Sequence, residues 1–243
     1  MSVKKHYDEH LGNFYSWMLG DFNKRQAEQE DFFIKHKIFP KSSKIALDLG
    51  AGNGIQSISL AKLGFSVKAI DFNKQLTNEL ESRINNLDIT IKIDDFTNFS
   101  TWSEYNPELI VCMGDTISHL SSQKQIEELV ENLHKITVPK GLFVVSFRDS
   151  SEELKDGQRF IPVKSDENRI HTCFLEYFVN LIKVSDILYE KKGKIWEQKV
   201  SCYLKLRLNP QIVIELFDWS GFRIINSEKI YGMHYMIFEK VSN

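Results

Sequence analysis

Short apolar runs alternate with amphipathic stretches along the first two thirds of the chain. The runs suit buried strands, and the amphipathic stretches repeat their apolar residues at helical spacing. The predicted strands lie at residues 44–49, 66–70, 88–93, 109–113 and 142–147. The predicted helices between them lie at residues 55–63, 74–86 and 122–137. Strands and helices that alternate in this way form right-handed crossovers and a parallel sheet.

Two further regions flank this alternation. Apolar residues between Tyr7 and Phe39 recur at helical spacing and predict one or two helices ahead of the sheet. From Phe160 to Leu208 the chain carries long β-type runs, and its breaks resemble hairpin turns, which predicts an added antiparallel sheet. Residues 209–219 then predict a helix, and residues 222–241 predict two final strands whose short link makes them an antiparallel pair.

The charge balance and the cysteines narrow the class of protein. The formal net charge is only −2, which argues against a nucleic-acid or membrane-surface partner. The cysteines Cys112, Cys173 and Cys202 are far apart and lack C-x-x-C spacing, so we expect buried thiols and no metal site. The polar N-terminus and the lack of a long apolar run lead us to expect a cytoplasmic protein.

A glycine-rich loop is the most specific chemical signal in the chain. The run from Asp48 to Gly54, DLGAGNG, lies between a predicted strand and a predicted helix. Glycines there let the chain turn sharply and let a ligand approach the backbone, next to the free N–H groups of the helix. Asp71 ends the next strand about 20 positions after Gly50, where a carboxylate can accept both ribose hydroxyls of a nucleotide-like ligand.

The spacing of the glycines distinguishes two cofactor classes. A dinucleotide fingerprint, G-x-G-x-x-G, needs its third glycine at the position that Ile55 occupies. The G-x-G-x-G spacing with the upstream Asp48 resembles motif I of the class I S-adenosylmethionine (SAM)-dependent methyltransferases. The resemblance implies SAM as cofactor and S-adenosylhomocysteine (SAH) as product. The cofactor-binding residues it implies in this part of the chain are Asp48, Gly50, Ala51, Gly52, Gly54, Asp71 and Phe72.

The resemblance extends along the later strands. In the family an acidic residue after the third strand contacts the adenine amino group and an apolar neighbour packs on the ring, roles that Asp94 or Asp95 and Phe96 would fill here. Met113 and Gly114 follow the fourth strand, where such enzymes place a loop between cofactor and substrate. The remaining cofactor contact we expect is Tyr15, from a group of N-terminal aromatic residues proposed as a lid, namely Tyr7, Phe14, Tyr15 and Trp17.

The resemblance also implies a fold class and a division of the chain. We expect an α/β, Rossmann-like, seven-stranded methyltransferase sheet with its last strand antiparallel, together with an inserted antiparallel β lobe. The expected parts are a helical cap over residues 1–40, a SAM-binding α/β domain over 41–150, a β substrate lobe over 151–208, and a helix and hairpin over 209–243 that complete the sheet.

The residues after the fourth and fifth strands suggest a small-molecule acceptor. The segments CMGDT, SHL and SFRD most resemble small-molecule methyltransferases of the glycine/sarcosine N-methyltransferase type. The best expectation is therefore transfer of a methyl group to the nitrogen of an amine or amino acid. The catalytic candidates are Asp115, His119, which would take a proton or orient the acceptor, and Arg148, which would hold a substrate carboxylate.

Other functions are also consistent with the sequence. An aromatic-rich insertion would also suit O- or C-methylation of a larger apolar or quinone-like acceptor, and a SAM-binding protein without turnover would carry the same loop. Methylation of nucleic acids is disfavoured because Asp115 is followed by Thr116 and Ile117, and not by the Pro-Pro of the nucleic-acid amino-methylating enzymes. The sequence indicates neither a particular oligomeric state nor the identity of the acceptor.

Overall fold

The strands of the protein form two separate sheets, seen in a computed structural model that describes residues 2–241. The larger sheet has seven strands in the order β10-β11-β5-β4-β1-β2-β3. Its strands are β1 (Ile45–Leu49), β2 (Ser66–Asp71), β3 (Ile89–Ile93), β4 (Leu109–Cys112), β5 (Leu142–Arg148), β10 (Phe222–Ile230) and β11 (Met233–Lys240). The first five are parallel, whereas β11 runs antiparallel to both of its neighbours. The predicted fold class is confirmed, with β11 inside the sheet and β10 at its edge.

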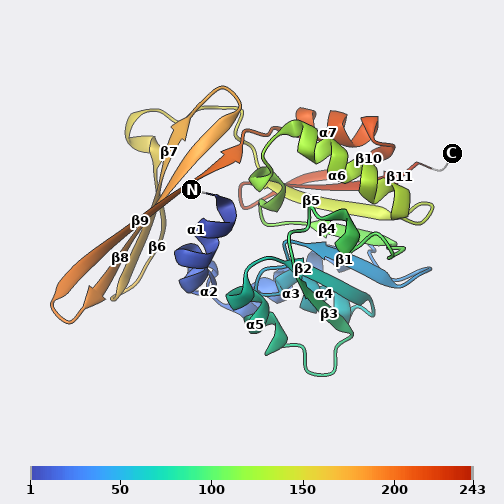
Figure 1. Cartoon of the computed structure of the whole chain (residues 1–243), viewed down its shortest axis with the longest axis horizontal. Helices are drawn as coiled ribbons and strands as arrows, with labels where there is room; N and C mark the ends of the chain where they lie inside the picture. Colours follow the sequence, from blue (N-terminus) through green and yellow to red (C-terminus); the bar gives the residue numbers. More distant parts are fainter. Residues whose placement is uncertain (1, 242–243) are drawn as a thin grey trace.

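Helices cover both faces of this sheet (Figure 1). On one face pack α3 (Phe22–Lys35), α4 (Ile55–Lys62) and α5 (Lys74–Glu81), and on the other pack α6 (Gln123–Ile136) and α7 (Pro210–Trp219). Successive residues of a strand point to opposite faces, so Leu47 joins the core under α6 and α7 while Ala46 joins the core under α3 and α4. Ser122 and Asn209 cap α6 and α7 through side-chain oxygens that accept backbone N–H bonds of 3.1 Å and 2.8 Å.

The smaller sheet is an antiparallel lobe in the order β6-β7-β8-β9. Its strands are β6 (Phe160–Ser165), β7 (Arg169–Tyr177), β8 (Leu181–Lys192) and β9 (Ile195–Leu206). The chain enters and leaves the lobe at one point, because Ser150 N donates to Leu208 O (2.9 Å) and Leu208 N donates to Ser150 Oγ (2.9 Å). Arg207 adds hydrogen bonds to the carbonyls of Ser150 (3.2 Å) and Ser151 (2.9 Å). We call this arrangement the clasp.

The N-terminal segment lies between the lobe and the seven-stranded sheet (Figure 1). It comprises α1 (Val3–Glu9), a 3₁₀ turn η1 (Leu11–Asn13) and α2 (Tyr15–Leu19). The sequence predicted one or two helices ahead of the sheet, but three are present, because Gly20 adopts φ +91° and ends α2 before α3 begins. Unlike α1 and α2, α3 packs on α4, where Gln26 Nε2 donates to Ser59 Oγ (3.2 Å).

One helix is shorter than its apolar spacing predicted. The sequence predicted a helix over residues 74–86, whereas α5 ends at Glu81. Ser82 Oγ donates to Glu79 O (2.7 Å), a bond that competes with helix continuation, and Asn85 takes φ +49°. Ile84 still packs against the core, which explains why the apolar spacing continues beyond the helix end.

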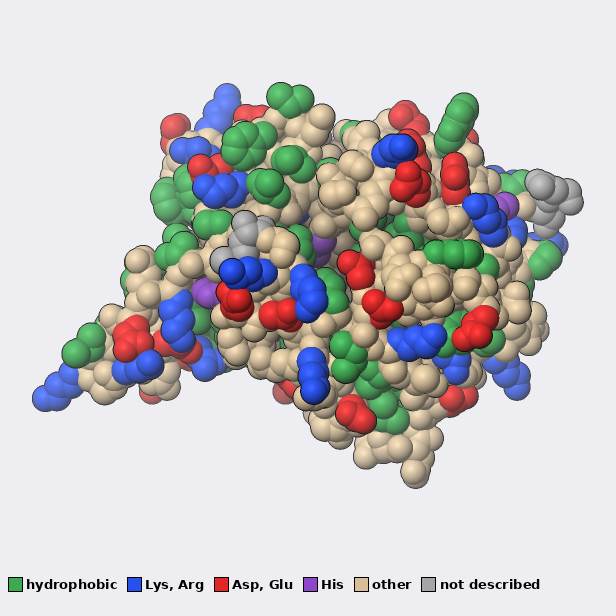
Figure 2. Space-filling view, in the orientation of Figure 1, with side chains coloured by type: hydrophobic (Ala, Val, Ile, Leu, Met, Phe, Trp, Pro, Cys, Tyr) green, Lys and Arg blue, Asp and Glu red, His purple; other side chains and the backbone are tan. Residues whose placement is uncertain are grey.

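The low net charge reflects a near balance of acidic and basic side chains. Figure 2 shows acidic and basic side chains interspersed over one face of the molecule. Over residues 2–241, no helix combines the length and the apolar character that crossing a membrane requires.

Candidate functional site

A cavity lies where β1, β2 and β4 of the large sheet end at their carboxyl termini. The empty space between its lining residues, including solvent at its mouth, is about 470 Å³. It is lined by Tyr7, Tyr15, Gly50, Gly52, Asp71, Phe72, Leu76, Phe96, Gly114, Thr116 and His119. This edge of a parallel sheet is where open α/β folds bind ligands.

The glycine loop forms one wall of the cavity. Gly50 has φ +74°, and a Cβ added there would lie 2.4 Å from Thr116 Cγ2, so this position accepts only glycine without rearrangement. Gly54 precedes α4 and packs in the same way against Leu80, with 2.3 Å from an added Cβ to Leu80 Cδ1. The loop is therefore held tightly against its neighbours, and Gly50 and Gly52 present bare backbone to the cavity.

Asp71 faces the cavity and also fixes the loop. Its Oδ2 accepts a hydrogen bond from Gly52 N (2.8 Å) and its Oδ1 accepts one from Asn73 N (2.8 Å). Burial raises the pKa of Asp71, although these two bonds oppose the shift. Each oxygen retains further lone-pair capacity for hydroxyl donors of a ligand.

Asp48 has a different environment. It is buried below the loop and does not line the cavity, and its Oδ2 accepts a hydrogen bond from Ser57 Oγ (2.6 Å) on α4. Burial raises the pKa of Asp48 to about 7, despite the lowering effect of that hydrogen bond. Its contact links β1 to α4, the two elements that flank the glycine loop.

Two N-terminal tyrosines form part of the opposite wall. Tyr7 comes from α1 and Tyr15 from α2, with their ring centroids 6.0 Å apart, and Tyr7 also meets Phe72 edge-on at 5.8 Å. Burial raises the pKa of Tyr15 to about 12 and that of Tyr7 well above its ordinary value. Both phenols therefore remain neutral near pH 7. Phe14, which belonged to the same predicted lid, packs instead against His171 of the lobe at 5.0 Å.

His119 lies in the cavity at the end of a 3₁₀ turn, η3 (Thr116–His119). Its Nε2 lies 3.5 Å from Tyr7 OH, and its ring centroid lies 5.4 Å from that of Tyr203 in the lobe. The buried Nδ1 has no hydrogen-bond partner among the described residues. Burial lowers the pKa of His119 to about 4, and the nearby Asp115 carboxylate opposes this only in part. The imidazole is therefore neutral near pH 7.

Asp115 joins the large sheet to the lobe. Its Oδ2 accepts a hydrogen bond from Lys205 Nζ (2.7 Å) on β9, and its Oδ1 accepts one from the backbone N–H of Arg148 (3.1 Å). Burial alone would raise the pKa of Asp115, but the charge of Lys205 and these hydrogen bonds lower it. Asp115 therefore carries a paired negative charge next to His119. The exposed side chain of Arg148 does not line the cavity.

Several predicted cofactor residues lie away from the cavity lining. Asp94 bonds to Thr101 and Asn98 within its own loop, and Asp95 Oδ1 accepts a hydrogen bond from Thr97 Oγ1 (2.8 Å), so only Phe96 of that segment lines the cavity. Ala51, Gly54 and Met113 also lie outside the lining.

Three lining residues were absent from the predicted site residues. Tyr7, Leu76 and Thr116 all line the cavity. Leu76 stands on the first turn of the helix after Asp71, and Thr116 follows the Gly114-Asp115 pair, so both lie next to segments that the sequence had marked. Tyr7 belonged to the N-terminal aromatic group that was proposed as a lid, but only Tyr15 of that group was assigned to the cofactor.

Comparisons with known proteins agree with this geometry. Residues 46–141, which hold the glycine loop and β1 to β4, match the family model described as "Methyltransferase domain". EEF1A lysine methyltransferase 2 of Homo sapiens is 33% identical over 120 residues, which cover 46% of this chain and 50% of that protein. Glycine N-methyltransferase of Mus musculus is 24% identical over 207 residues, which cover 72% of this chain and 69% of the relative. The chain thus spans only half the length of the human relative.

Among solved structures, the CcbJ methyltransferase from Streptomyces caelestis has the same fold over nearly the whole chain. The TM-score is 0.80 at 15% sequence identity, and the match covers 98% of this chain and 99% of that one. The matched domain and the shared fold agree with the methyltransferase domain and the SAM cofactor that the glycine loop predicted.

Proposed function

We propose that this protein transfers a methyl group from SAM to the nitrogen of a small-molecule amine or amino acid. Two of its relatives are named as a lysine methyltransferase and a glycine N-methyltransferase, which supports an amine acceptor. The net charge of only −2 supports a small acceptor over a nucleic acid, and acidic and basic side chains are interspersed on the face shown in Figure 2.

The cavity lining suits SAM. Asp71 would accept hydrogen bonds from the ribose hydroxyls, and Phe96 and Leu76 offer apolar surface to the adenine. The rings of Tyr7 and Tyr15 suit a positively charged sulfonium, because aromatic faces attract cations. When bound, SAM supplies an already activated methyl group. The protein then has to align the acceptor with that group and keep water away.

The acceptor side is supported by His119, Asp115 and Arg148. An amine attacks only through a free lone pair, so its ammonium form must first lose a proton. The pKa of His119 is too low for it to take a proton from an ammonium, so its neutral imidazole would orient the nitrogen of an amine that binds in its free form, and the paired Asp115 carboxylate would hold the segment before His119 in place. Arg148 lies exposed at the end of β5 and outside the cavity lining, so an acceptor carboxylate that it bound would have to lie at the mouth of the site.

One observation carries the proposal. The half-buried imidazole of His119 lies between the aromatic wall of the cavity and the lobe, at 3.5 Å from Tyr7 OH and with its ring 5.4 Å from that of Tyr203. At this place it can hydrogen-bond to an acceptor nitrogen and orient that atom.

The proposal is tested by measuring methyl release from labelled SAM over a panel of amines, amino acids and phenols. Amines or amino acids are expected to be methylated, and calorimetry is expected to show binding of SAH. His119→Asn should lower kcat by about 10²-fold because the group that orients the acceptor nitrogen is lost, with SAH affinity changed little. His134→Asn is the matched control, since His134 lies on α6 against Phe222, away from the cavity.

Other outcomes would overturn the proposal. Turnover of phenols alone would favour O-methylation. SAH binding without turnover over the whole panel would favour a non-catalytic SAM-binding protein. An equal loss of kcat in the two histidine variants would exclude a specific role for His119.

A further inference from the structure

A second cluster of reactive side chains lies in the lobe, on the face that meets α1. Cys173 of β7 pairs directly with Asp186 of β8, and Asp186 pairs directly with Ser201 of β9. Paired residues project from the same face of a sheet, and so do residues two apart on one strand. His171 therefore joins Cys173 on that face. The cluster is buried, with His171 and Asp186 only 1% and 2% exposed.

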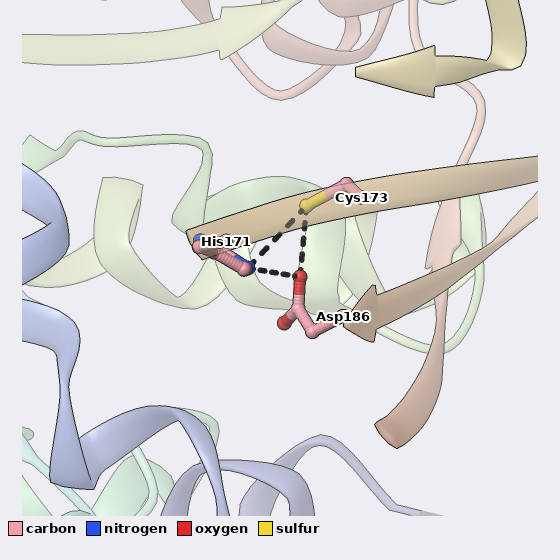
Figure 3. A group of neighbouring side chains, drawn as sticks. All are labelled: His171, Cys173 and Asp186. Carbon is pink, nitrogen blue, oxygen red and sulfur yellow. Dashed lines mark hydrogen bonds and ion pairs between the residues drawn. The ribbon is translucent and has the colours of Figure 1, made fainter. Parts of the chain in front are cut away.

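The side-chain atoms of this cluster converge on one point (Figure 3). Asp186 Oδ1 lies 3.1 Å from His171 Nε2 and 2.8 Å from Cys173 Sγ, and the sulfur lies 3.8 Å from that same Nε2. Around a tetrahedral ion with bonds of about 2.0–2.3 Å, neighbouring ligand atoms lie roughly 3.3–3.6 Å apart. Shifts of well under 1 Å would bring the three atoms to that spacing.

A second histidine contacts Asp186 from the N-terminal segment, outside the group of three residues whose ligand atoms lie within 4.8 Å of one another. His6 on α1 is fully buried, and its Nε2 lies 2.8 Å from Asp186 Oδ2 without the alignment of a hydrogen bond. Its Nδ1 lies 2.8 Å from Ser201 Oγ. Histidines that bind metals commonly hydrogen-bond through their other ring nitrogen in this way, which fixes the ring orientation.

The residue types point to a particular ion. A thiol, two imidazoles and a carboxylate form the mixed sulfur, nitrogen and oxygen set that zinc accepts in four-coordinate sites. Calcium and magnesium prefer sets made only of oxygen. A hydrogen-bonded cluster alone leaves the buried His6 Nε2, which has no hydrogen-bond partner among the described residues, unexplained.

We propose that His6, His171, Cys173 and Asp186 form a binding site for one zinc ion, although the sequence had suggested no metal. The ion would join α1 to strands β7 and β8. His6 is followed by Tyr7, which lines the cavity, so zinc would hold this wall of the cavity against the lobe. The site has no part in the chemistry of methyl transfer, and its test does not depend on the proposed function.

The experiment measures metal content in the full chain purified without chelators, using elemental mass spectrometry. About one zinc per chain is expected, the stoichiometry of a single four-ligand site. Cys173→Ser and His171→Gln should each lower the zinc content several-fold. Cys202→Ser is the matched control, because Cys202 lies on the other face of the lobe, with its sulfur 3.1 Å from Ser185 Oγ, and it should retain full zinc.

A spectrum of the wild-type chain provides an independent readout. The chain is stripped of metal and reloaded with Co²⁺, which should give a thiolate-to-cobalt absorption band and the intense visible bands of a tetrahedral site. The band should be absent from Cys173→Ser and present in Cys202→Ser. If a cluster variant fails to fold, the wild-type spectrum and zinc content still decide the question. Negligible zinc together with no cobalt band in the folded wild type would overturn the proposal, as would equal zinc in Cys173→Ser and Cys202→Ser.

Discussion

Asp48 and Asp71 show how position sets the behaviour of two identical side chains at the ends of neighbouring strands. Asp71 faces the cavity and receives two backbone N–H bonds, whereas Asp48 is enclosed and receives only the hydroxyl of Ser57 as a donor from another side chain. The sequence assigned both residues to cofactor binding. In the structure Asp71 can contact a ligand, whereas Asp48 supports the glycine loop that lines the cavity.

At this scale Asp71→Ala should weaken SAH binding by about 2–3 kcal/mol, because the hydroxyls of the ligand and the loop N–H groups lose their acceptor. Asp71→Asn keeps one oxygen and should lose less. Calorimetric titration with SAH measures both. Asp94→Ala is the control, since its carboxylate bonds within its own loop. An Asp94 variant as weak as the Asp71 variant would instead support the adenine contact that the sequence predicted.

Asp48 leads to a prediction about pH. Its pKa is raised to about 7 in the folded chain, so the native state binds an extra proton between pH 4 and 7. The stability associated with this proton is present at low pH and is lost as the pH rises through 7. Asp48→Asn removes this titration and can keep the bond from Ser57. Relative to wild type, the variant should gain on the order of 2–3 kcal/mol between pH 5 and 8.

Urea unfolding of both proteins at pH 5 and pH 8 measures this gain. A difference between variant and wild type that is the same at both pH values would contradict the raised pKa.

At the scale of elements, the glycine loop is held in place by what packs against it. Gly50→Ala would force a methyl group to within 2.4 Å of Thr116 Cγ2 at φ +74°. We expect a loss of about 2–4 kcal/mol in the free energy of unfolding, from the clash and the left-handed backbone together. Gly193→Ala is the matched control, because it has φ +64° but no atom within 4 Å of an added Cβ. It should lose only about 1–2 kcal/mol.

Denaturant unfolding of the two glycine variants separates steric contact from backbone strain. Equal losses would show that Thr116 moves aside at no cost. Adding Thr116→Ser to Gly50→Ala removes the offending methyl group and should restore part of the stability.

The elements were predictable where local sequence determines them. Capping residues such as Ser122 and Asn209 and the periodic apolar residues marked most strands and helices. The helix end at Glu81 was missed because Ile84 stays in the core after the helix has stopped. The break at Gly20 was missed because the apolar residues on both sides keep helical spacing. Apolar periodicity reports burial, and burial continues through a turn.

At the scale of the whole molecule, the contacts that complete the site join distant segments. Lys205 pairs with Asp115 across 90 residues of sequence, and His6 meets Asp186 from the other end of the chain. No local sequence pattern predicts such contacts between distant residues. The sequence could therefore indicate the cofactor half of the site, which is built within one βαβ unit, but could not indicate which lobe residues face His119.

The Lys205–Asp115 pair gives a prediction at this scale. Both side chains are largely buried, so Lys205→Met leaves Asp115 unpaired and should cost about 3–5 kcal/mol in the free energy of unfolding. The double variant Lys205→Met/Asp115→Asn removes the uncompensated charge and should recover a large part of this loss. A double-mutant cycle from denaturant unfolding measures the coupling. Additive losses would show that the two residues do not stabilise each other.

The clasp at Ser150 and Leu208 has a consequence for how such a protein can evolve. Because the lobe leaves and rejoins the large sheet at one point, recombination could replace it as one continuous gene segment without altering the order of the seven strands. The SAM-binding α/β domain would be inherited unchanged, while the surfaces of the lobe that face the acceptor could change. Every replacement would have to present a cation to Asp115 in the place of Lys205 and a surface that packs against the N-terminal segment.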